Sequence, residues 1–487
     1  MKRFHNDVEV ARRHARQVFV AAATALAVLF MGNNLPSALY GVFRAAFGYS
    51  SLTQTLLYAA AVAVIAPGLL VFGPLSDVIG RRALILAGLI SFGVGDVLFV
   101  VADGTAWLFA ARVAQGLGMA CGSAAGVAAL RESAAGFVSD QVRAQRVAAL
   151  TATVCMTGGL AFGPLLAGIL AQYGRAPRDL SFLVHLALVA IAFVAALRVP
   201  GKAATMVGHW HPALLRMPES TRQTFALVAA SGFLSWSVLG VFSAVIPSFF
   251  SDLFDTKNLA LTSAALALMI ATSALAQLGA HRLRALTAQL VGLGALAVGL
   301  ALLVVATATR DPVVAVLAMV GSGVGHGLIF VGEMTEITVA TPAEERGAAI
   351  SVVHLINYMG LAGPAIGVGF LSLSYGLLAA TRLAALVIAV LCVLLIPLVI
   401  RAATKSRRET HLFAREGAKV ALTRRRTAEG ETVVAEIKAA GGSAVFIEGD
   451  LENTGSIPAV EEAARGSSFN HLPGAAGYKP ELRSACS

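Results

Sequence analysis

Charged residues are scarce in this chain. They make up 13% of its 487 residues, whereas 57% of the residues are hydrophobic. Soluble globular domains carry about 25% charged residues, so this composition excludes an ordinary soluble protein and indicates an integral membrane protein. The four cysteines show no disulfide framework and no metal-binding spacing, and no metal or other cofactor is expected.

Negative charge is also in short supply, which leaves a formal net charge of +10. Most basic residues lie in short segments between apolar runs and at the two ends of the chain, on the side shared with the N-terminus. This asymmetry is a topology signal, so both termini are predicted to be cytoplasmic. Topology and contact with the lipid bilayer account for the basic residues, and nucleic acid is not an expected partner.

Apolar runs of roughly 20 residues, the length of a membrane-spanning helix, recur along the chain. They predict an all-α membrane protein with twelve spans, near residues 18–40, 52–72, 83–101, 107–130, 147–171, 181–197, 224–247, 259–280, 285–306, 313–340, 347–371 and 376–400. The predicted domains are an N-terminal segment (1–17), a six-helix bundle (18–199), a connector (200–222), a second six-helix bundle (223–400) and a tail (401–487).

The two predicted bundles share a repeated sequence pattern. Arg146 and Pro164 in the first half recur 200 residues later as Arg346 and Pro364, each time with a Gly-Leu-Ala segment just before the proline. Two related halves around a central site indicate a transporter architecture rather than an enzyme.

A short charged segment between the second and third runs reads Gly73-Pro74-Leu75-Ser76-Asp77-Val78-Ile79-Gly80-Arg81-Arg82. Its glycines and proline predict a tight reversal, and its arginines are also what any cytoplasmic loop would carry. The segment resembles the loop signature of the major facilitator superfamily, with Val78 in place of an arginine. The resemblance implies a gating loop. Glu132, after the fourth run, is placed to meet Arg81 or Arg82 when the cytoplasmic side closes, and a solvated helix end is the alternative for it. The expected gating residues are Gly73, Asp77, Gly80, Arg81, Arg82 and Glu132.

The fourth run contains Arg112 and Gln115 in a segment that resembles the superfamily's Arg-x-x-Gln-Gly-x-Gly signature. The resemblance implies a part for Arg112 in proton coupling, because that arginine has this role in many antiporters. Asp96 lies at a similar depth in the third run, so an Asp96–Arg112 pair is expected. The alternative is a static buried salt bridge.

The fifth run contains Gly159, Gly163, Pro164 and Gly168, which predict a kinked helix that a neighbour approaches closely. Their order resembles the fifth-helix motif of drug:proton antiporters, with Ala167 in place of one glycine. The resemblance implies efflux, whereas small-residue packing alone is the simpler explanation.

Further polar and aromatic residues are candidates for the central site. His326 can titrate near neutral pH, although packing is the commoner role for a lone histidine in an apolar helix. Glu333 and Glu336 could meet Arg282 and Arg284 or lie at solvated helix ends, while His185 and His354 are expected only to pack. The first run carries amides where many drug:proton antiporters carry an acid. The expected coupling residues are Arg112, Asp96, His326 and Glu333, and the expected substrate-cavity residues are Asn33, Asn34, Gln115, Phe233, Trp236 and Phe242. The three aromatic residues of this set could equally face lipid.

The tail beyond Ile400 has the composition of a soluble chain. A predicted strand that ends near Thr423, a helix over 428–440 and a strand over Ser443–Glu448 resemble part of the nucleotide-binding half of a short-chain dehydrogenase/reductase. The glycine-rich phosphate turn should lie just upstream, where the chain is still an apolar helix. A remnant without nucleotide binding is therefore expected, although Arg424–Arg426 and Asp450 fall where that family contacts the cofactor.

Residues 18–400 are thus expected to form a secondary transporter that resembles the drug:proton antiporters. It would export a small amphipathic or drug-like compound in exchange for protons, as a monomer in a bacterial inner membrane, and it would not be an enzyme. Two alternatives stay open: proton-coupled uptake of a small metabolite, and a membrane-tethered oxidoreductase that uses the tail.

Overall fold

The computed structural model describes residues 2–199, 222–280, 283–341 and 345–415, and in the tail residues 419–424, 434–435, 438–439 and 443–448. The first half contains α1 (Lys2–Asn34), η1 (Leu35–Ala38), α2 (Tyr40–Phe47), α3 (Ser51–Ile79), α4 (Arg81–Val100), α5 (Thr105–Ala135), α6 (Gln141–Tyr173) and α7 (Leu180–Ala196). The second half contains α8 (Arg222–Phe254), α9 (Leu259–Gly279), α10 (Ala285–Thr309), α11 (Pro312–Ala340), α12 (Arg346–Arg415), β1 (Lys419–Arg424) and β2 (Ser443–Glu448).

Ten of the described helices are long and apolar enough to cross a membrane, judged by length and composition. The apolar helix α7 is shorter, with 17 residues. Helix α12 has 70 residues, and Gly376 interrupts it with a φ of 78°, a left-handed conformation that favours glycine. Two successive helices therefore lie within α12, at the boundary that the sequence predicted between residues 371 and 376.

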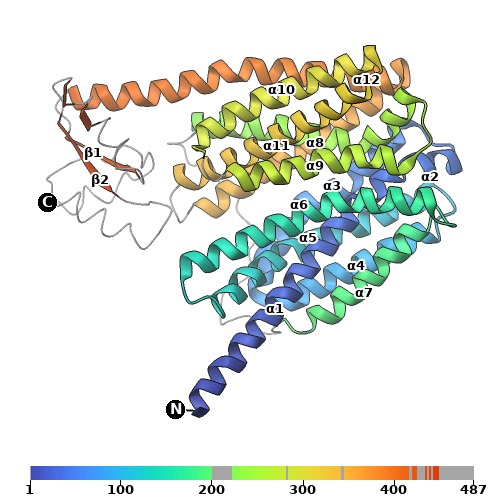
Figure 1. The fold of residues 1–487 in the computed structure, drawn as a ribbon, viewed down its shortest axis with the longest axis horizontal. Helices are drawn as coiled ribbons and strands as arrows, with labels where there is room; N and C mark the ends of the chain where they lie inside the picture. Colours follow the sequence, from blue (N-terminus) through green and yellow to red (C-terminus); the bar gives the residue numbers. More distant parts are fainter. Residues whose placement is uncertain are drawn as a thin grey trace.

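The helices form two bundles (Figure 1). Helices α1 to α7 make the N-terminal bundle, and α8 to α12 make the C-terminal bundle. We call the side at which α1 begins the near side, and the opposite side the far side. The bundles meet at the far side and diverge toward the near side, where the tail also lies (Figure 1).

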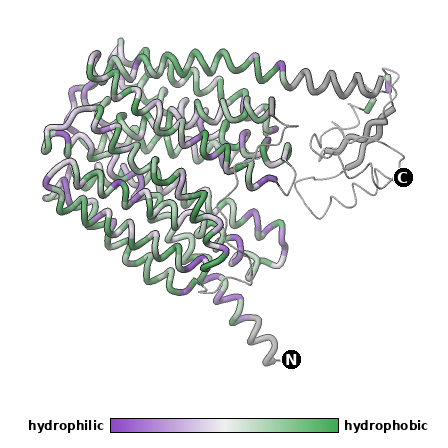
Figure 2. The backbone as a smooth tube through the Cα atoms, turned by 180° about the vertical axis from the view of Figure 1, so that it is seen from behind, coloured by the Kyte–Doolittle hydropathy of each residue, from purple (hydrophilic) through white to green (hydrophobic). Residues whose placement is uncertain are grey.

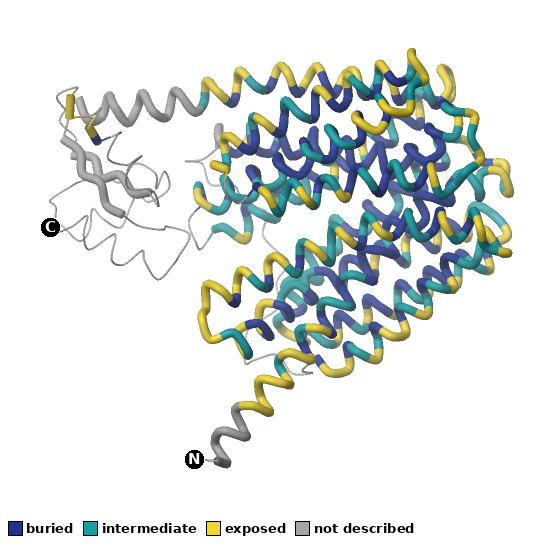
Figure 3. The backbone as a smooth tube through the Cα atoms, viewed as in Figure 1, coloured by how far each residue is buried: buried dark blue, intermediate teal, exposed yellow. Residues whose placement is uncertain are grey.

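The outward surfaces of both bundles are apolar (Figure 2), and their exposed residues lie on the outer faces of the helices (Figure 3). Exposed apolar side chains include Ile90, Val97, Ile191, Val390 and Leu394. A helix satisfies its backbone hydrogen bonds internally, so such faces are suited to contact with lipid. The largest buried core joins the two bundles and includes Phe43 and Phe249.

The two halves pack in equivalent ways. Helix α6 packs on α1 and, across the bundle boundary, on α9; the first part of α12 packs on α8 and, across the boundary, on α3. Glycines make these approaches close: a Cβ added at Gly360 would lie 2.6 Å from the Phe233 carbonyl oxygen, and one added at Gly369 would lie 3.1 Å from Leu52 Cα. The structural equivalence of α6 and α12 follows the sequence repeat.

The charged segment between α3 and α4 is more helical than the sequence predicted. Helix α3 runs through Pro74 to Ile79, and the reversal is confined to Gly80, whose φ is 95°. Proline removes one backbone hydrogen bond without necessarily ending a helix in a membrane protein, whereas a positive φ strongly favours glycine. In place of the predicted loop, a single residue, Gly80, forms the turn between α3 and α4.

In the tail, α12 continues past Ile400 to Arg415, and the strands β1 and β2 pair in parallel, from Lys419 opposite Ser443 to Arg424 opposite Glu448. The connector 200–221, most of the predicted 428–440 helix, Arg425, Arg426 and Asp450 lie outside the described residues. The resemblance to a short-chain dehydrogenase/reductase stays a prediction.

Candidate functional site

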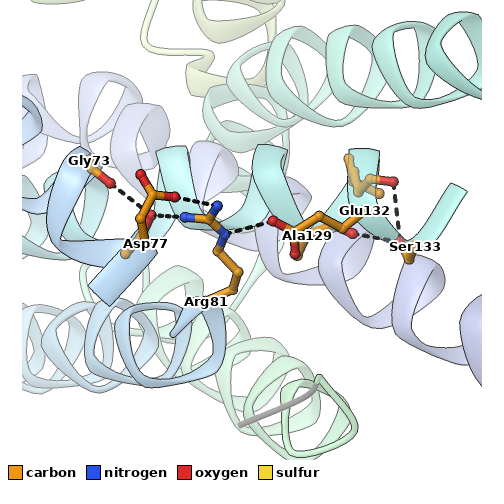
Figure 4. A network of polar contacts seen from close by, with 8 residues as sticks. Gly73, Asp77, Arg81, Ala129, Glu132 and Ser133 are labelled. Atoms are coloured by element: carbon orange, nitrogen blue, oxygen red, sulfur yellow. Dashed lines mark hydrogen bonds and ion pairs between the residues drawn. The ribbon is translucent and has the colours of Figure 1, made fainter. Parts of the chain in front are cut away.

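Arg81 joins three helices at the near side (Figure 4). It forms an ion pair with Asp77 at the end of α3 and donates to the Ser76 hydroxyl, which itself donates to the Gly73 carbonyl oxygen at 2.7 Å. Its Nε also donates to Glu132 Oε1 of α5 at 3.0 Å. The predicted Arg81–Glu132 pair is present, and it lies within the N-terminal bundle while the two bundles are apart on this side.

Arg112 is buried on α5 and does not contact Asp96. Its Nη1 donates to the Asn33 carbonyl oxygen at 3.0 Å and to Gln115 Oε1 at 2.7 Å, and its Nε donates to the Leu57 carbonyl oxygen at 3.3 Å. The guanidinium also lies 6.0 Å from the centre of the Tyr58 ring. The expected Asp96–Arg112 pair is therefore wrong, because backbone carbonyls and an amide take up the donors of Arg112.

The partner of Asp96 is His185 on α7. Their Oδ2 and Nδ1 atoms lie 2.6 Å apart, both side chains are fully buried, and His185 Nε2 lies 3.0 Å from the Val28 carbonyl oxygen of α1. His185 was predicted to be a packing residue only, so this pairing was not predicted. The sequence does contain a signal for this pair: Asp96 lies four residues before the far end of α4 and His185 lies five residues after the start of α7, so the two residues lie at a similar depth.

The motif glycines of α6 hold this helix against two neighbours. A Cβ added at Gly159 would lie 2.7 Å from the Ala27 carbonyl oxygen of α1, and one added at Gly163 would collide with the Met31 carbonyl oxygen. One added at Gly168 would lie 2.6 Å from the Leu259 carbonyl oxygen of α9, across the bundle boundary. The segment therefore ties α1 to α6 and the N-terminal bundle to the C-terminal one.

Asn34 belongs to this helix interface. Its Nδ2 donates to the Leu160 carbonyl oxygen at 3.1 Å, and its Oδ1 accepts from Ser37 at 2.9 Å. The side chain is buried and has both groups in use, so its expected place in a substrate cavity is wrong for this conformation. Asn33 is half-buried, and its Oδ1 has no hydrogen-bond partner among the described residues.

Gln54 links the two bundles at the far side. Its Nε2 donates to the Ala244 carbonyl oxygen at 2.8 Å and to Ser248 Oγ at 3.2 Å on α8, and the side chain is buried. Gln172, near the end of α6, accepts from the Leu259 amide of α9 at 2.8 Å. Together with the Gly168 contact, these bonds make the far side the closed side. Neither glutamine was predicted from the sequence, since a lone amide near a helix end carries no distinctive pattern.

Glu333 lies inside the C-terminal bundle on α11 and is fully buried. Asn357 Nδ2 of α12 donates to both of its oxygens, at 3.0 and 3.2 Å. A pairing of Glu333 with Arg282 or Arg284 was predicted from the sequence. Arg282 lies outside the described residues, and within the described part of the chain the ion pairs closer than 4.0 Å do not include Glu333. The amide replaces an arginine as its partner.

Aromatic side chains gather around Trp236 on α8. Its ring centre lies 5.6 Å from that of Tyr358, 6.1 Å from that of Phe330 and 6.2 Å from that of His326. Tyr358 also packs against the core of the N-terminal bundle. Trp236 therefore lies in an aromatic group at the bundle interface.

Phe233 and Phe242, the other two aromatic residues predicted for the cavity, are not among the rings that contact Trp236. Phe242 is buried in the core that joins the bundles, so its predicted place in an aromatic cavity wall is wrong for this conformation. Phe233 is partly buried and packs against that same core. His326 is bonded through Nδ1 to Ser273 Oγ at 2.8 Å.

Two helical bundles with buried charges and amides between membrane-facing surfaces are the architecture of a secondary transporter. The chain matches the Major Facilitator Superfamily model over residues 20–364, which is more than half of its length. This protein belongs to the major facilitator superfamily.

Three curated relatives are similar over part of the chain. The methylenomycin A resistance protein of Bacillus subtilis is 28% identical over 232 residues, 46% of this chain and 45% of the relative. The chloramphenicol resistance protein CraA of Acinetobacter baumannii is 31% identical over 188 residues, 37% of this chain and 40% of the relative. The multidrug transporter MdfA of Escherichia coli is 32% identical over 136 residues, 28% of this chain and 31% of the relative. The chain thus spans less than half the length of each.

Solved structures share the fold at low sequence identity. A bacterial homologue of the human lysosomal transporter Spinster, inward-facing and occupied, gives a TM-score of 0.62 at 14% identity, over 80% of this chain and 96% of that one. The nucleoside transporter NupG gives 0.63 at 12% identity, over 80% and 99%. These likenesses concern the fold alone.

Proposed function

We propose that this protein is a secondary active transporter that exports a small amphipathic or drug-like compound in exchange for protons by alternating access. The observation that carries the proposal is the packing of α6. Its glycines hold the helix against α1 within one bundle and against α9 of the other. The resistance and multidrug proteins that share sequence with this chain favour efflux over uptake.

Twelve spans in two six-helix bundles follow from counting α7 and both parts of α12 as crossings. The basic residues of the near side, such as Arg81 and Arg146, support a cytoplasmic location for that side and for both termini. A monomer in a bacterial inner membrane is part of the same proposal. In this orientation the two bundles diverge toward the cytoplasm (Figure 1), which supports a cytoplasm-facing state, the state in which an exporter takes up its cargo. The far-side contacts of Gln54 and Gly168 would break in the outward-open state.

Transport would use the residues between the bundles. Asn33 and Gln115 in the N-terminal bundle and Trp236 in the C-terminal bundle offer an acceptor, a donor and an aromatic surface for an amphipathic compound, since Asn33 Oδ1, Gln115 Nε2 and Trp236 Nε1 have no hydrogen-bond partner among the described residues. Proton exchange needs a group whose protonation changes as the site alternates between sides. Arg112, Asp96, His326 and Glu333 are the candidates for this coupling, one of which is assigned below as the proton site, and the Arg81–Asp77–Glu132 cluster is proposed to set the near-side gate.

A resistance panel tests the proposal. Bacteria without endogenous efflux pumps would carry the wild-type chain or an empty vector and grow on chloramphenicol, ethidium and a series of other amphipathic toxic compounds. Raised resistance to at least one compound, with lower intracellular accumulation, is expected. Increased accumulation driven by the proton gradient would support uptake instead. Nicotinamide-cofactor binding by the full chain would support the oxidoreductase alternative.

A further inference from the structure

We propose that Glu333, held by Asn357 inside the C-terminal bundle, is the site that binds and releases the exchanged proton. This inference rests on the proposed proton-coupled transport and assigns the proton to one residue. The carboxyl group lies between α8, α11 and α12, with no exposed surface, and its described hydrogen bonds come from the Asn357 amide alone.

A buried oxygen atom beside Glu333 could accept a hydrogen bond from the carboxyl group when Glu333 is protonated. Asn357 Oδ1 is buried and has no hydrogen-bond partner among the described residues. This oxygen and Glu333 Oε1 both face Gly232 of α8, where an added Cβ would lie 2.5 Å from Asn357 Oδ1 and would collide with Glu333 Oε1. A protonated carboxyl group carries an O–H donor for this orphan acceptor, whereas a carboxylate only accepts. The neutral acid also avoids an unpaired charge at membrane depth.

Asp96 does not need to exchange a proton. The Val28 carbonyl oxygen is an acceptor only, so His185 Nε2 carries the hydrogen of that bond. One further proton then lies between His185 Nδ1 and Asp96 Oδ2, and the pair is neutral overall whichever atom holds it. The pair therefore bonds α4, α7 and α1 together as a neutral unit. Proton exchange there would break the hydrogen bond between His185 Nδ1 and Asp96 Oδ2, whereas Asp96 Oδ1 is buried and has no hydrogen-bond partner among the described residues.

The surroundings of Glu333 are largely uncharged. Helix α8 presents Gly232, and α10 places Gln289 next to Gly332, where it donates to Ser231 at 2.8 Å. The titratable and charged side chains on the helices around it are His326 and Glu336 on α11, His354 and Tyr358 on α12, and Arg284 and Arg346 at the near-side helix ends. A change of charge at Glu333 is thus felt mainly by Asn357 and by the helix that carries it.

That helix also carries the contact to the other bundle. Tyr358 follows Asn357 directly, packs on the N-terminal bundle and meets Trp236, one turn along α8 from Gly232. Phe330, which also meets Trp236, lies one turn from Glu333 on α11. Protonation at Glu333 is therefore one helical turn away from the aromatic group at the bundle interface. Loss of the proton would leave Asn357 Oδ1 unpaired again and shift the Tyr358 contact.

Glu333→Gln tests the site, because glutamine keeps the size of the side chain and an N–H donor for Asn357 Oδ1 but cannot titrate. The matched control is Glu336→Gln, one turn away on the same helix, and Asp96→Asn is the second comparison. Infrared spectra of each full-length purified protein over a pH series would follow the carbonyl band of a buried protonated carboxyl group, with no substrate present. Loss of the titrating band in Glu333→Gln and its retention in both comparisons is expected; a band that persists in Glu333→Gln overturns the proposal.

The second readout is transport in proteoliposomes, with chloramphenicol and ethidium as probes. Glu333→Gln should lose transport driven by a pH gradient and keep exchange of labelled probe for unlabelled probe at equilibrium, whereas Glu336→Gln should keep both. Full gradient-driven transport by Glu333→Gln would overturn the inference. If the wild type itself ignores the pH gradient, the proposed function fails, and the infrared band alone then decides whether Glu333 is a protonation site. Should Glu333→Gln not fold, Asn357→Leu, which should shift the band, replaces it.

Discussion

Replacement of Gly168 by alanine should disfavour the conformation in which the far side is closed. The new Cβ would lie 2.6 Å from the Leu259 carbonyl oxygen, whereas ordinary contacts begin at 3.4 Å. The Leu259 oxygen belongs to the backbone, so α6 and α9 must separate by about 0.8 Å to restore normal contact. Overpacking of this kind costs about 1–3 kcal/mol. If only the far-side-closed state bears this cost, its population relative to the outward-open state falls about 5- to 150-fold.

A distance measurement between the two helices tests this prediction. Spin labels would be placed at Tyr173, the last residue of α6, and at Lys257, before the start of α9, in a chain whose cysteines have been replaced. Gly168→Ala should move the distance distribution toward longer values and slow ethidium export. Gly158→Ala is the matched control on the same helix, because a Cβ there meets nothing within 4 Å. A distribution and an export rate equal to those of the wild type would refute the packing argument.

Three further predictions follow from the contacts described above. Arg81→Ala and Asp77→Asn should abolish resistance, because they remove the ion pairs of the proposed near-side gate. The amount of protein in the membrane should not change, because such partly exposed ion pairs contribute at most about 1 kcal/mol to stability. Resistance equal to that of the wild type would mean that the charges of the cluster only set the topology. A stop after Lys405 should leave resistance intact, and its loss at equal expression would give the tail a role. Asp96→Ala should lower the free energy of unfolding by about 3–5 kcal/mol, since it leaves His185 without its partner in a buried site; thermal unfolding in detergent checks it, and a midpoint equal to that of the wild type would contradict the pairing.

Apolar runs were sufficient to place the helices, because each span must be apolar along about 20 residues. They did not predict that α3 continues through Pro74, or that η1 and α2 follow the first span. Both features depend on how the chain packs after it leaves the lipid core. Gly80 was correctly placed in a reversal, since a positive φ is a local requirement that a single glycine meets, and Gly376, the first residue of the last predicted span, has a positive φ too.

The side-chain pairs were harder to predict than the helices. Matching residues by depth brought Asp96 to the right level of the bundle but gave it Arg112 instead of His185, because depth does not fix the rotation of a helix about its axis. The same limit explains why Asn34 and Phe242 were assigned to a cavity that they do not face. Local motifs fared better: Asp77 and Arg81 lie four residues apart on either side of the Gly80 reversal and form an ion pair, and Glu132 lies within reach of Arg81.

The most direct test of the account is proton-driven transport by the purified protein. Proteoliposomes that contain the wild-type chain would be given a pH gradient with the acidic side inside, and ethidium or chloramphenicol would be added outside with a pH-sensitive dye in the lumen. In the molecules whose near side faces outward, the account predicts accumulation of a probe together with alkalinisation of the lumen, and neither effect when the gradient is collapsed. Accumulation that persists without the gradient, or proton movement that no probe stimulates, would contradict exchange of a compound for protons.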